Sequence, residues 1–118
     1  MSDTLTMTDT EILDQIKSEV ADNRVFLYLK GTPDMPRCGL SNQVVQILNI
    51  TGAEFGSRDV LADPRIREVL SEWSDWPTIP QLFVDGKLVG GCDIVREMYQ
   101  SGELQELLQS RGIAVAVS

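Results

Sequence analysis

Residues 25–29, VFLYL, begin the stretch VFLYLKGTPDMPRCGLS, in which three local patterns follow one another. The unbroken apolar run of these five residues is typical of a strand that is buried on both faces of a sheet. Two prolines and a glycine within residues 30–36 then predict a stiff loop. Apolar residues at helical spacing from Leu40 onward predict a helix that ends at Gly52. Cys38 therefore stands between a stiff loop and a helix.

Further elements are predicted on both sides of this strand–loop–helix unit. Thr8 and Glu11 have the spacing of a capping box, which predicts a helix over residues 9–22. Residues 54–59 give a weaker strand pattern. The predicted order up to this point is helix, strand, helix, strand.

Asp63-Pro64 predicts the start of a third helix. The aspartate side chain can accept from the free amides of a first turn, and proline at the first position has no amide that needs a partner. Four apolar residues at helical spacing form its expected buried side: Ile66, Val69, Leu70 and Trp73.

Asp85-Gly86 accommodates the positive φ angles of a tight turn, so residues 81–84 and 87–89 predict a β-hairpin. A last helical section covers about residues 93–108. The complete order α-β-α-β-α-β-β-α provides helices for both faces of a central sheet, and it predicts an α/β fold.

The length of 118 residues fits one domain, which we place at residues 9–112 between tails at 1–8 and 113–118. The net charge of −8 argues against nucleic acid as a partner, and no apolar run approaches the length of a membrane span. Residues 1–14 contain no Lys or Arg, unlike a signal or transit peptide. Two cysteines far apart in such a chain predict a reducing, cytoplasmic location.

Cys38 is placed for thiol chemistry without help from an imidazole, because the chain contains no histidine. The amino end of a helix favours a thiolate, and Lys30 and Arg37 are expected to add positive potential. The alternative is a buried inert cysteine, which a loop–helix junction disfavours. Ser41 stands where a second redox cysteine would be, so Cys38 must recruit sulfur from another molecule. The Ser41 hydroxyl either hydrogen-bonds the sulfur or caps the helix.

Two other short motifs suggest a binding surface. A cis peptide bond before Pro80 would expose the backbone of Ile79 for pairing with a peptide. Two glycines before Cys92-Asp93 permit close backbone approach, and the helix that starts there offers free amides to a carboxylate. For Cys92 itself we expect a small buried core residue rather than a functional thiol.

Three motifs occur in a specific order and spacing: KGTP at 30–33 with PxCGxS at 36–41, WPTIPQ at 76–81, and VGGCD at 89–93. With them, the chain resembles the monothiol glutaredoxins of the thioredoxin fold over about residues 9–110. The resemblance implies a thioredoxin/glutaredoxin fold, in which a central four-stranded mixed sheet is flanked by helices on both faces.

The same resemblance implies a groove for glutathione. Lys30 and Arg67 would pair with its glycine carboxylate, and the backbone of Ile79 would pair with its cysteinyl unit. Cys92 and Asp93 would hold the γ-glutamyl end. The assignment suits a tripeptide with two carboxylates, because cations serve one end, helix-terminus amides serve the other, and the ammonium suits an aspartate.

The resemblance also implies that Cys38 is both the catalytic thiol and a metal ligand. The loop between Lys30 and Cys38 is longer than in dithiol glutaredoxins, which implies weak oxidoreductase turnover and suits cluster binding. Leu40 departs from the family pattern, which has phenylalanine there. Leucine keeps an apolar cover beside the sulfur but removes an aromatic face.

The leading expectation is a protein that binds glutathione and a [2Fe–2S] cluster and acts in cluster storage, cluster transfer and redox homeostasis. A cluster needs four ligands, which two chains and two glutathione thiolates would supply in a cluster-bridged homodimer. The resemblance adds BolA-type proteins and apo iron–sulfur recipients as partners. The alternative is a glutathione-dependent disulfide oxidoreductase that deglutathionylates proteins by a monothiol route. A third interpretation is a regulatory module that senses the cluster.

Overall fold

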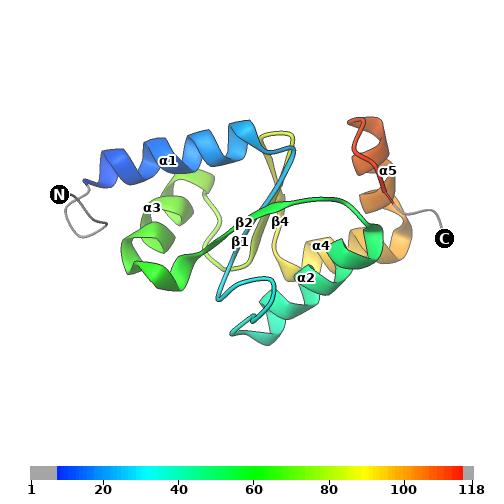
Figure 1. The fold of residues 1–118 in the computed structure, drawn as a ribbon, viewed down its shortest axis with the longest axis horizontal. Coiled ribbons are helices and arrows are strands. Elements are labelled where there is room, and N and C mark those ends of the chain that lie inside the picture. Colours follow the sequence, from blue (N-terminus) through cyan, green and yellow to red (C-terminus); the bar gives the residue numbers. More distant parts are fainter. Residues whose placement is uncertain (1–7, 116–118) are drawn as a thin grey trace.

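One four-stranded sheet organises the computed structural model, which describes residues 8–115 (Figure 1). Its strands are β1 (Val25–Leu29), β2 (Gly56–Asp59), β3 (Gln81–Val84) and β4 (Lys87–Gly90), in the order β2-β1-β3-β4. β1 is parallel to β2 and antiparallel to β3, and β3 is antiparallel to β4. The sheet is therefore mixed and four-stranded, as the resemblance implied.

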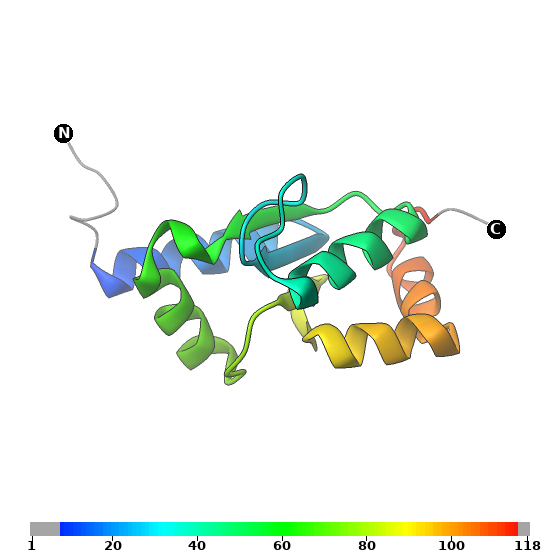
Figure 2. The ribbon, with the colours of Figure 1, turned by 90° about the horizontal axis from the view of Figure 1, so that it is seen from below.

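Helices cover both faces of this sheet (Figure 2). They are α1 (Asp9–Asp22), α2 (Gly39–Thr51), the short 3₁₀ helix η2 (Val60–Ala62), α3 (Pro64–Ser74), α4 (Cys92–Ser101) and α5 (Glu103–Ser110). α1 and α3 pack on one face, and α2, α4 and α5 pack on the other.

The prediction that residues 25–29 are buried on both faces is confirmed, since all five residues of β1 are buried. Side chains alternate along a strand, so Val25, Leu27 and Leu29 join the core below α2 and α4. Phe26 and Tyr28 join the core below α1 and α3. β1 is thus the shared wall of two hydrophobic cores, and its carboxyl end delivers the chain to the loop before Cys38.

Several local predictions are confirmed. The Thr8 hydroxyl accepts from the Glu11 amide at 3.1 Å, and the Glu11 carboxylate accepts from the Thr8 amide at 2.9 Å, which completes the capping box of α1. Asp63 accepts from the Arg65 amide at 3.0 Å at the start of α3.

The predicted hairpin turn is also confirmed, because Asp85 and Gly86 have φ angles of 52° and 81°. The last helical section is divided into α4 and α5 at Gly102, whose φ of 85° ends α4 in a left-handed cap. The apolar spacing continues across this break, so periodicity alone predicted one section.

The expected buried side of α3 is only partly correct. Ile66 and Leu70 are buried and Val69 is partly buried, but Trp73 is 36 % exposed. Its ring stacks on Phe83 at a centroid distance of 5.7 Å. Trp73 lies at the rim of the helix–sheet contact, where one side of its ring covers the core and the rest of the side chain reaches solvent.

The two predicted tails fall largely outside the described residues, which exclude 1–7 and 116–118. Ile113 and Val115, at the start of the expected C-terminal tail, pack against the core below α2 and α4. Within residues 8–115, no helix combines the length and apolar character needed to cross a bilayer.

Candidate functional site

Cys38 is the N-cap residue of α2 and is partly exposed. The backbone N–H groups of Ser41, chiefly, and of Leu40 hold the pKa of the Cys38 thiol below its usual value. The charge of Lys30 and the hydroxyl of Ser41 act in the same direction. The structure therefore agrees with the expectation of an accessible cysteine that ionises readily.

The Ser41 side chain has a second role. Its hydroxyl is fully buried and accepts a hydrogen bond from the Lys30 amide at 3.1 Å. It also helps to lower the pKa of Cys38. The bond to Lys30 is neither of the two alternatives left by the sequence, which were a bond to the sulfur and a helix cap. The attachment of Ser41 to the end of β1 was not foreseen.

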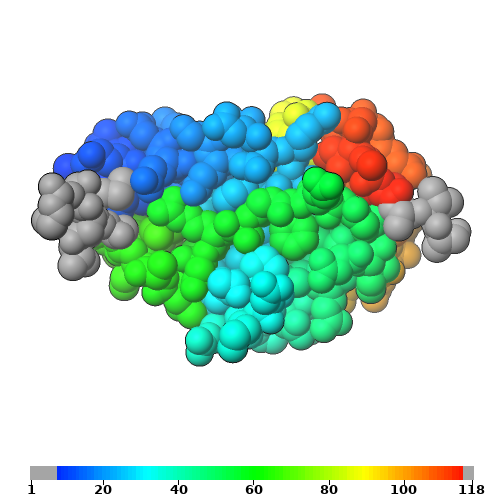
Figure 3. Space-filling model, in the orientation of Figure 1, coloured from blue at the N-terminus to red at the C-terminus, as the bar shows by residue number. Residues whose placement is uncertain are grey.

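A closed loop joins β1 to Cys38. The Gly31 amide donates to Asp59 at 2.9 Å, and the Arg37 amide donates to the Lys30 carbonyl at 2.8 Å. Gly31 and Pro36 form an isolated antiparallel bridge across the loop. Figure 3 shows the loop at the molecular surface, beside α2 and the segment from β2 to α3. These bonds fix the approach of the chain to Cys38.

Gly31 is required by this loop. Its φ is 92°, and a Cβ atom there would lie 2.5 Å from the Met35 carbonyl oxygen and 2.7 Å from the Arg37 nitrogen. Both neighbours are backbone atoms, which cannot rotate away. The Arg37 side chain packs against the same glycine. Lys30 is the cation that lowers the pKa of Cys38, and the contribution expected from Arg37 stays a prediction.

The structure brings the two predicted carboxylate-binding cations together. Lys30 and Arg67 line a cavity of about 390 Å³ between the end of β1, η2 and the start of α3. Glu68 lines the same cavity. Within residues 8–115, neither cation forms an ion pair, so both charges are available to a ligand.

The residues predicted to bind the rest of glutathione line a second cavity, of about 200 Å³. It lies between the start of α2, the segment before β3 and the start of α4. Ile79, Cys92 and Asp93 line it, together with the half-exposed Leu40. The Ile79–Pro80 peptide bond is cis, as expected. Opposite it, the helix start at Cys92 provides free amides.

Cys92 is only 5 % exposed, and burial raises the pKa of its thiol. The Cys92 sulfur donates to the amide oxygen of Gln43 at 3.3 Å. Gln43 also accepts from Arg96 at 3.2 Å, and Arg96 pairs with Asp93 at 3.1 Å. Sequence reasoning missed Gln43 and Arg96. The three-residue spacing of Asp93 and Arg96 on one helix was an available signal for that pair, whereas nothing in the sequence linked Gln43 to them.

Cys38 is electrostatically linked to both cavities. Lys30, from the first cavity, helps to lower the pKa of Cys38, and the charge of Cys38 helps to raise the pKa of Cys92, in the second. Cys38 itself lines neither cavity, and these two interactions connect it to the residues that do.

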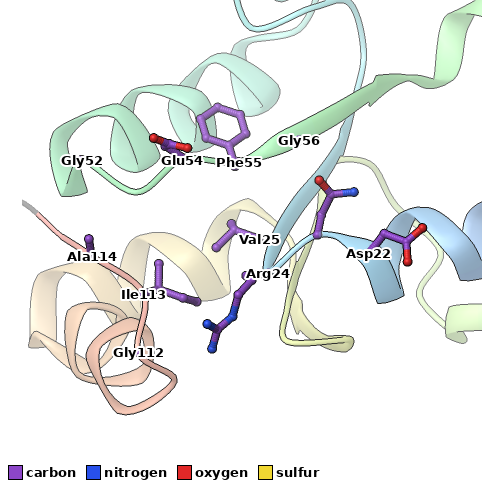
Figure 4. A pocket seen from close by; sticks show the side chains of 11 residues that line it. Asp22, Arg24, Val25, Gly52, Glu54, Phe55, Gly56, Gly112, Ile113 and Ala114 are labelled. Atoms are coloured by element: carbon purple, nitrogen blue, oxygen red, sulfur yellow. The ribbon is translucent and has the colours of Figure 1, made fainter.

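A larger cavity, of about 600 Å³, lies at the opposite end of β1 (Figure 4). It is bounded by Arg24, by the Gly52–Gly56 segment and by the C-terminal residues from Gly112. The Arg24 guanidinium donates to the Arg111 carbonyl. Neither cysteine lines this cavity, so it is separate from the thiol site.

Comparison with known proteins agrees with this geometry. A sequence model of the Glutaredoxin family matches residues 25–89. Probable monothiol glutaredoxin 2 of Rickettsia typhi is 50% identical over 103 residues, which cover 87% of this chain and 93% of the relative.

Two solved structures are also similar. The solution structure of a monomeric truncated mutant of Trypanosoma brucei 1-C-Grx1 has a TM-score of 0.79 at 42% identity, covering 96% of this chain and 99% of that one. The crystal structure of a buckwheat glutaredoxin–glutathione complex has a TM-score of 0.79 at 25% identity, covering 90% and 94%. These relatives cover most of the chain, and Cys38 is followed by Ser41 rather than by a second cysteine. The chain therefore belongs to the monothiol glutaredoxins of the thioredoxin-fold superfamily.

Proposed function

We propose that this monothiol glutaredoxin binds glutathione across the Cys38 surface and carries a [2Fe–2S] cluster as cargo, for cluster storage and transfer and for redox homeostasis. The observation that carries the proposal is the contrast in access. Cys38 is the cysteine that is partly exposed and has a lowered pKa, and it interacts electrostatically with Lys30 of the cationic cavity and with Cys92 at the start of α4.

Glutathione matches the two cavities in charge. Lys30 and Arg67 offer cations to the glycine carboxylate, and Asp93 at the start of α4 offers a partner to the γ-glutamyl ammonium. Ile79 would pair its backbone with the cysteinyl unit between them. Support also comes from the glutathione complex of the buckwheat glutaredoxin, which shares the fold.

A cluster would require ligands from outside one chain. Within residues 8–115, no group of three or more His, Cys, Asp or Glu side chains could hold a metal ion. Cys38 would bind one iron, and a [2Fe–2S] cluster needs four ligands such as thiolates. A second chain and two glutathione thiolates complete that number in a cluster-bridged homodimer. Such a cluster can leave by ligand exchange, because two of its ligands are small diffusible thiols.

Anaerobic reconstitution with iron, sulfide and glutathione tests the proposal. We expect visible absorbance and a dimeric mass that both require glutathione. Cys38→Ser should remove both, whereas Cys92→Ser, the matched control, should keep most of the colour because Cys92 is buried. A colourless monomer from the unaltered chain would refute cluster binding, and a colourless Cys92→Ser variant would make Cys92 a ligand.

The lowered pKa of Cys38 also favours a second function, which is reduction of protein–glutathione mixed disulfides. The Cys38 thiolate attacks the glutathione sulfur, and the target protein leaves as a thiolate. A second glutathione thiolate then attacks the bound glutathione sulfur, which releases glutathione disulfide and restores Cys38. A coupled glutathione-reductase assay measures this turnover, and rapid turnover would favour the enzyme over the carrier.

The proposed partners besides glutathione are BolA-type proteins and apo iron–sulfur recipients, in the cytoplasm, where free thiols stay reduced. A BolA-type protein would replace one chain of the dimer. Affinity capture with the reconstituted chain, compared with Cys38→Ser, tests this. Partners retained equally by both forms would not depend on the cluster.

A further inference from the structure

A polar cluster beside Asp93 has no role in the function proposed so far. Arg96 donates to Asp93 at 3.1 Å and to the Gln43 amide oxygen at 3.2 Å. The same oxygen accepts from the Cys92 thiol at 3.3 Å. Gln43 lies on α2 and the other three residues lie on α4, so the cluster connects the helix of Cys38 to the second cavity.

The two charges of this cluster are accessible. The Asp93 side chain is 81 % exposed and that of Arg96 is 44 % exposed. An exposed ion pair contributes little net free energy, so a ligand can open it at small cost. Gln43 remains as a second acceptor for Arg96 and keeps the guanidinium near the start of α4 when Asp93 turns to a ligand.

The chemistry of the γ-glutamyl end explains why two opposite charges are useful there. This end is an α-amino acid head, which carries an ammonium and a carboxylate on one carbon. Asp93 alone can pair only with the ammonium. A guanidinium beside it can pair with the carboxylate in a planar, charge-assisted contact that the helix amides reinforce.

We propose that Arg96, held by Gln43, is a specificity-determining residue that binds the α-carboxylate of a γ-glutamyl ligand while Asp93 binds its ammonium. The inference rests on the proposed glutathione site and adds a second charge to its γ-glutamyl end. The Asp93–Arg96 pair is then exchanged for two ion pairs with the ligand. The site would select an intact amino-acid head over a head that carries one charge.

Two S-methylated tripeptides test this, since neither can form a disulfide. One is S-methylglutathione, and the other is its 4-aminobutyryl analogue, which lacks only the α-carboxylate. Calorimetric Kd values are compared for the unaltered chain, for Arg96→Gln and for Arg111→Gln. Arg111 is a suitable control because it is 40 % exposed and pairs with the exposed Asp85.

We expect Arg96→Gln to weaken S-methylglutathione binding about tenfold and to change binding of the 4-aminobutyryl analogue less than about twofold. Arg111→Gln should change neither. Equal weakening of both ligands, or no weakening of either, would overturn the role of Arg96 while glutathione binding by the unaltered chain stands. If the unaltered chain binds neither ligand, the glutathione site itself is refuted, and the role of Arg96 with it.

Discussion

The two cysteines of this chain both lie at helix starts, one position apart in register, and have opposite properties. Cys38 is the N-cap of α2 and Cys92 is the first residue of α4, so each is placed at the positive end of a helix. The pKa of Cys38 is lowered, chiefly by the backbone N–H of Ser41. The pKa of Cys92 is raised, chiefly by burial. A helix start is therefore not sufficient to make a reactive thiol.

The difference lies in what each sulfur contacts. The backbone N–H groups of Ser41 and Leu40 stabilise the Cys38 thiolate, and this sulfur is open to reagents. Cys92 gives its proton to Gln43, which stabilises the neutral thiol, and it packs in the core below α2 and α4. The surroundings of Cys38 stabilise a thiolate, and those of Cys92 stabilise a neutral thiol.

The largest expected effect is on alkylation. At neutral pH in the folded chain, Cys38 should react with iodoacetamide on the order of 100 times faster than Cys92, because thiolate fraction and access both favour it. Mass spectrometry of Cys38→Ser and Cys92→Ser measures each thiol separately. The pH at half-maximal rate should lie below the ordinary thiol pKa of about 8.5 for Cys38. Similar rates for the two thiols would contradict the comparison.

Gly31→Ala should change the alkylation rate of Cys38 and leave that of Cys92 unchanged. The added methyl would clash with loop backbone, and we expect the free energy of unfolding to fall by about 2–3 kcal/mol. Gly39→Ala is the control, because no neighbouring atom lies within 4 Å of a Cβ at that position. Chemical denaturation gives the free energies, and alkylation of each cysteine reports the local effect. Equal losses in the two variants would show that the loop is not constrained as described.

Ser41→Ala removes the hydroxyl that joins the Lys30 amide to the Cys38 surface. An unpaired amide in a partly buried position should cost about 1–2 kcal/mol. The pKa of Cys38 should rise toward its ordinary value, since one hydrogen-bond partner is lost. Ser110→Ala, which removes an exposed hydroxyl, is the control. An unchanged pH profile of Cys38 alkylation would exclude the Ser41 side chain as a partner of the sulfur.

The smallest effect is the pH dependence of stability. The folded pKa of Cys38 is below its unfolded value, so its thiolate contributes stability above about pH 8.5 that is lost as the pH falls through the folded pKa. The folded pKa of Cys92 is above its unfolded value, so Cys92 destabilises the fold as the pH rises past about 8.5. Between pH 7 and 10, Cys38→Ser should therefore lose stability relative to the unaltered chain, and Cys92→Ser should gain it. If the free energy of unfolding changes with pH in the same way in all three proteins, the predicted opposite effects of the two cysteines are refuted.

The features that the sequence predicted correctly are local ones, which depend on residues close together in the chain. The run at residues 25–29, the capping box of Thr8 and the Asp63-Pro64 helix start are local patterns, and the structure confirms each of them. The position of Cys38 at a helix start is local in the same sense.

Contacts between distant segments were not predictable in this way. Gln43 meets Cys92 across 49 positions, and Trp73 is exposed because of where α3 meets the sheet. The Arg37 Cγ lies beside Gly31, a contact within the loop that only the folded loop reveals. The exposure and partner of each polar group are tertiary properties, so they had to come from the structure.

The hydroxyl at position 41 has a consequence for attempts to engineer the protein into a dithiol enzyme. Ser41→Cys would recreate the sequence pattern of a two-thiol enzyme in one step. Sulfur accepts hydrogen bonds weakly, however, and the new thiol would enter a fully enclosed slot that now secures the end of the central strand. A second sulfur would therefore be gained at the cost of this hydrogen bond, because position 41 serves the end of the central strand as well as the thiol site.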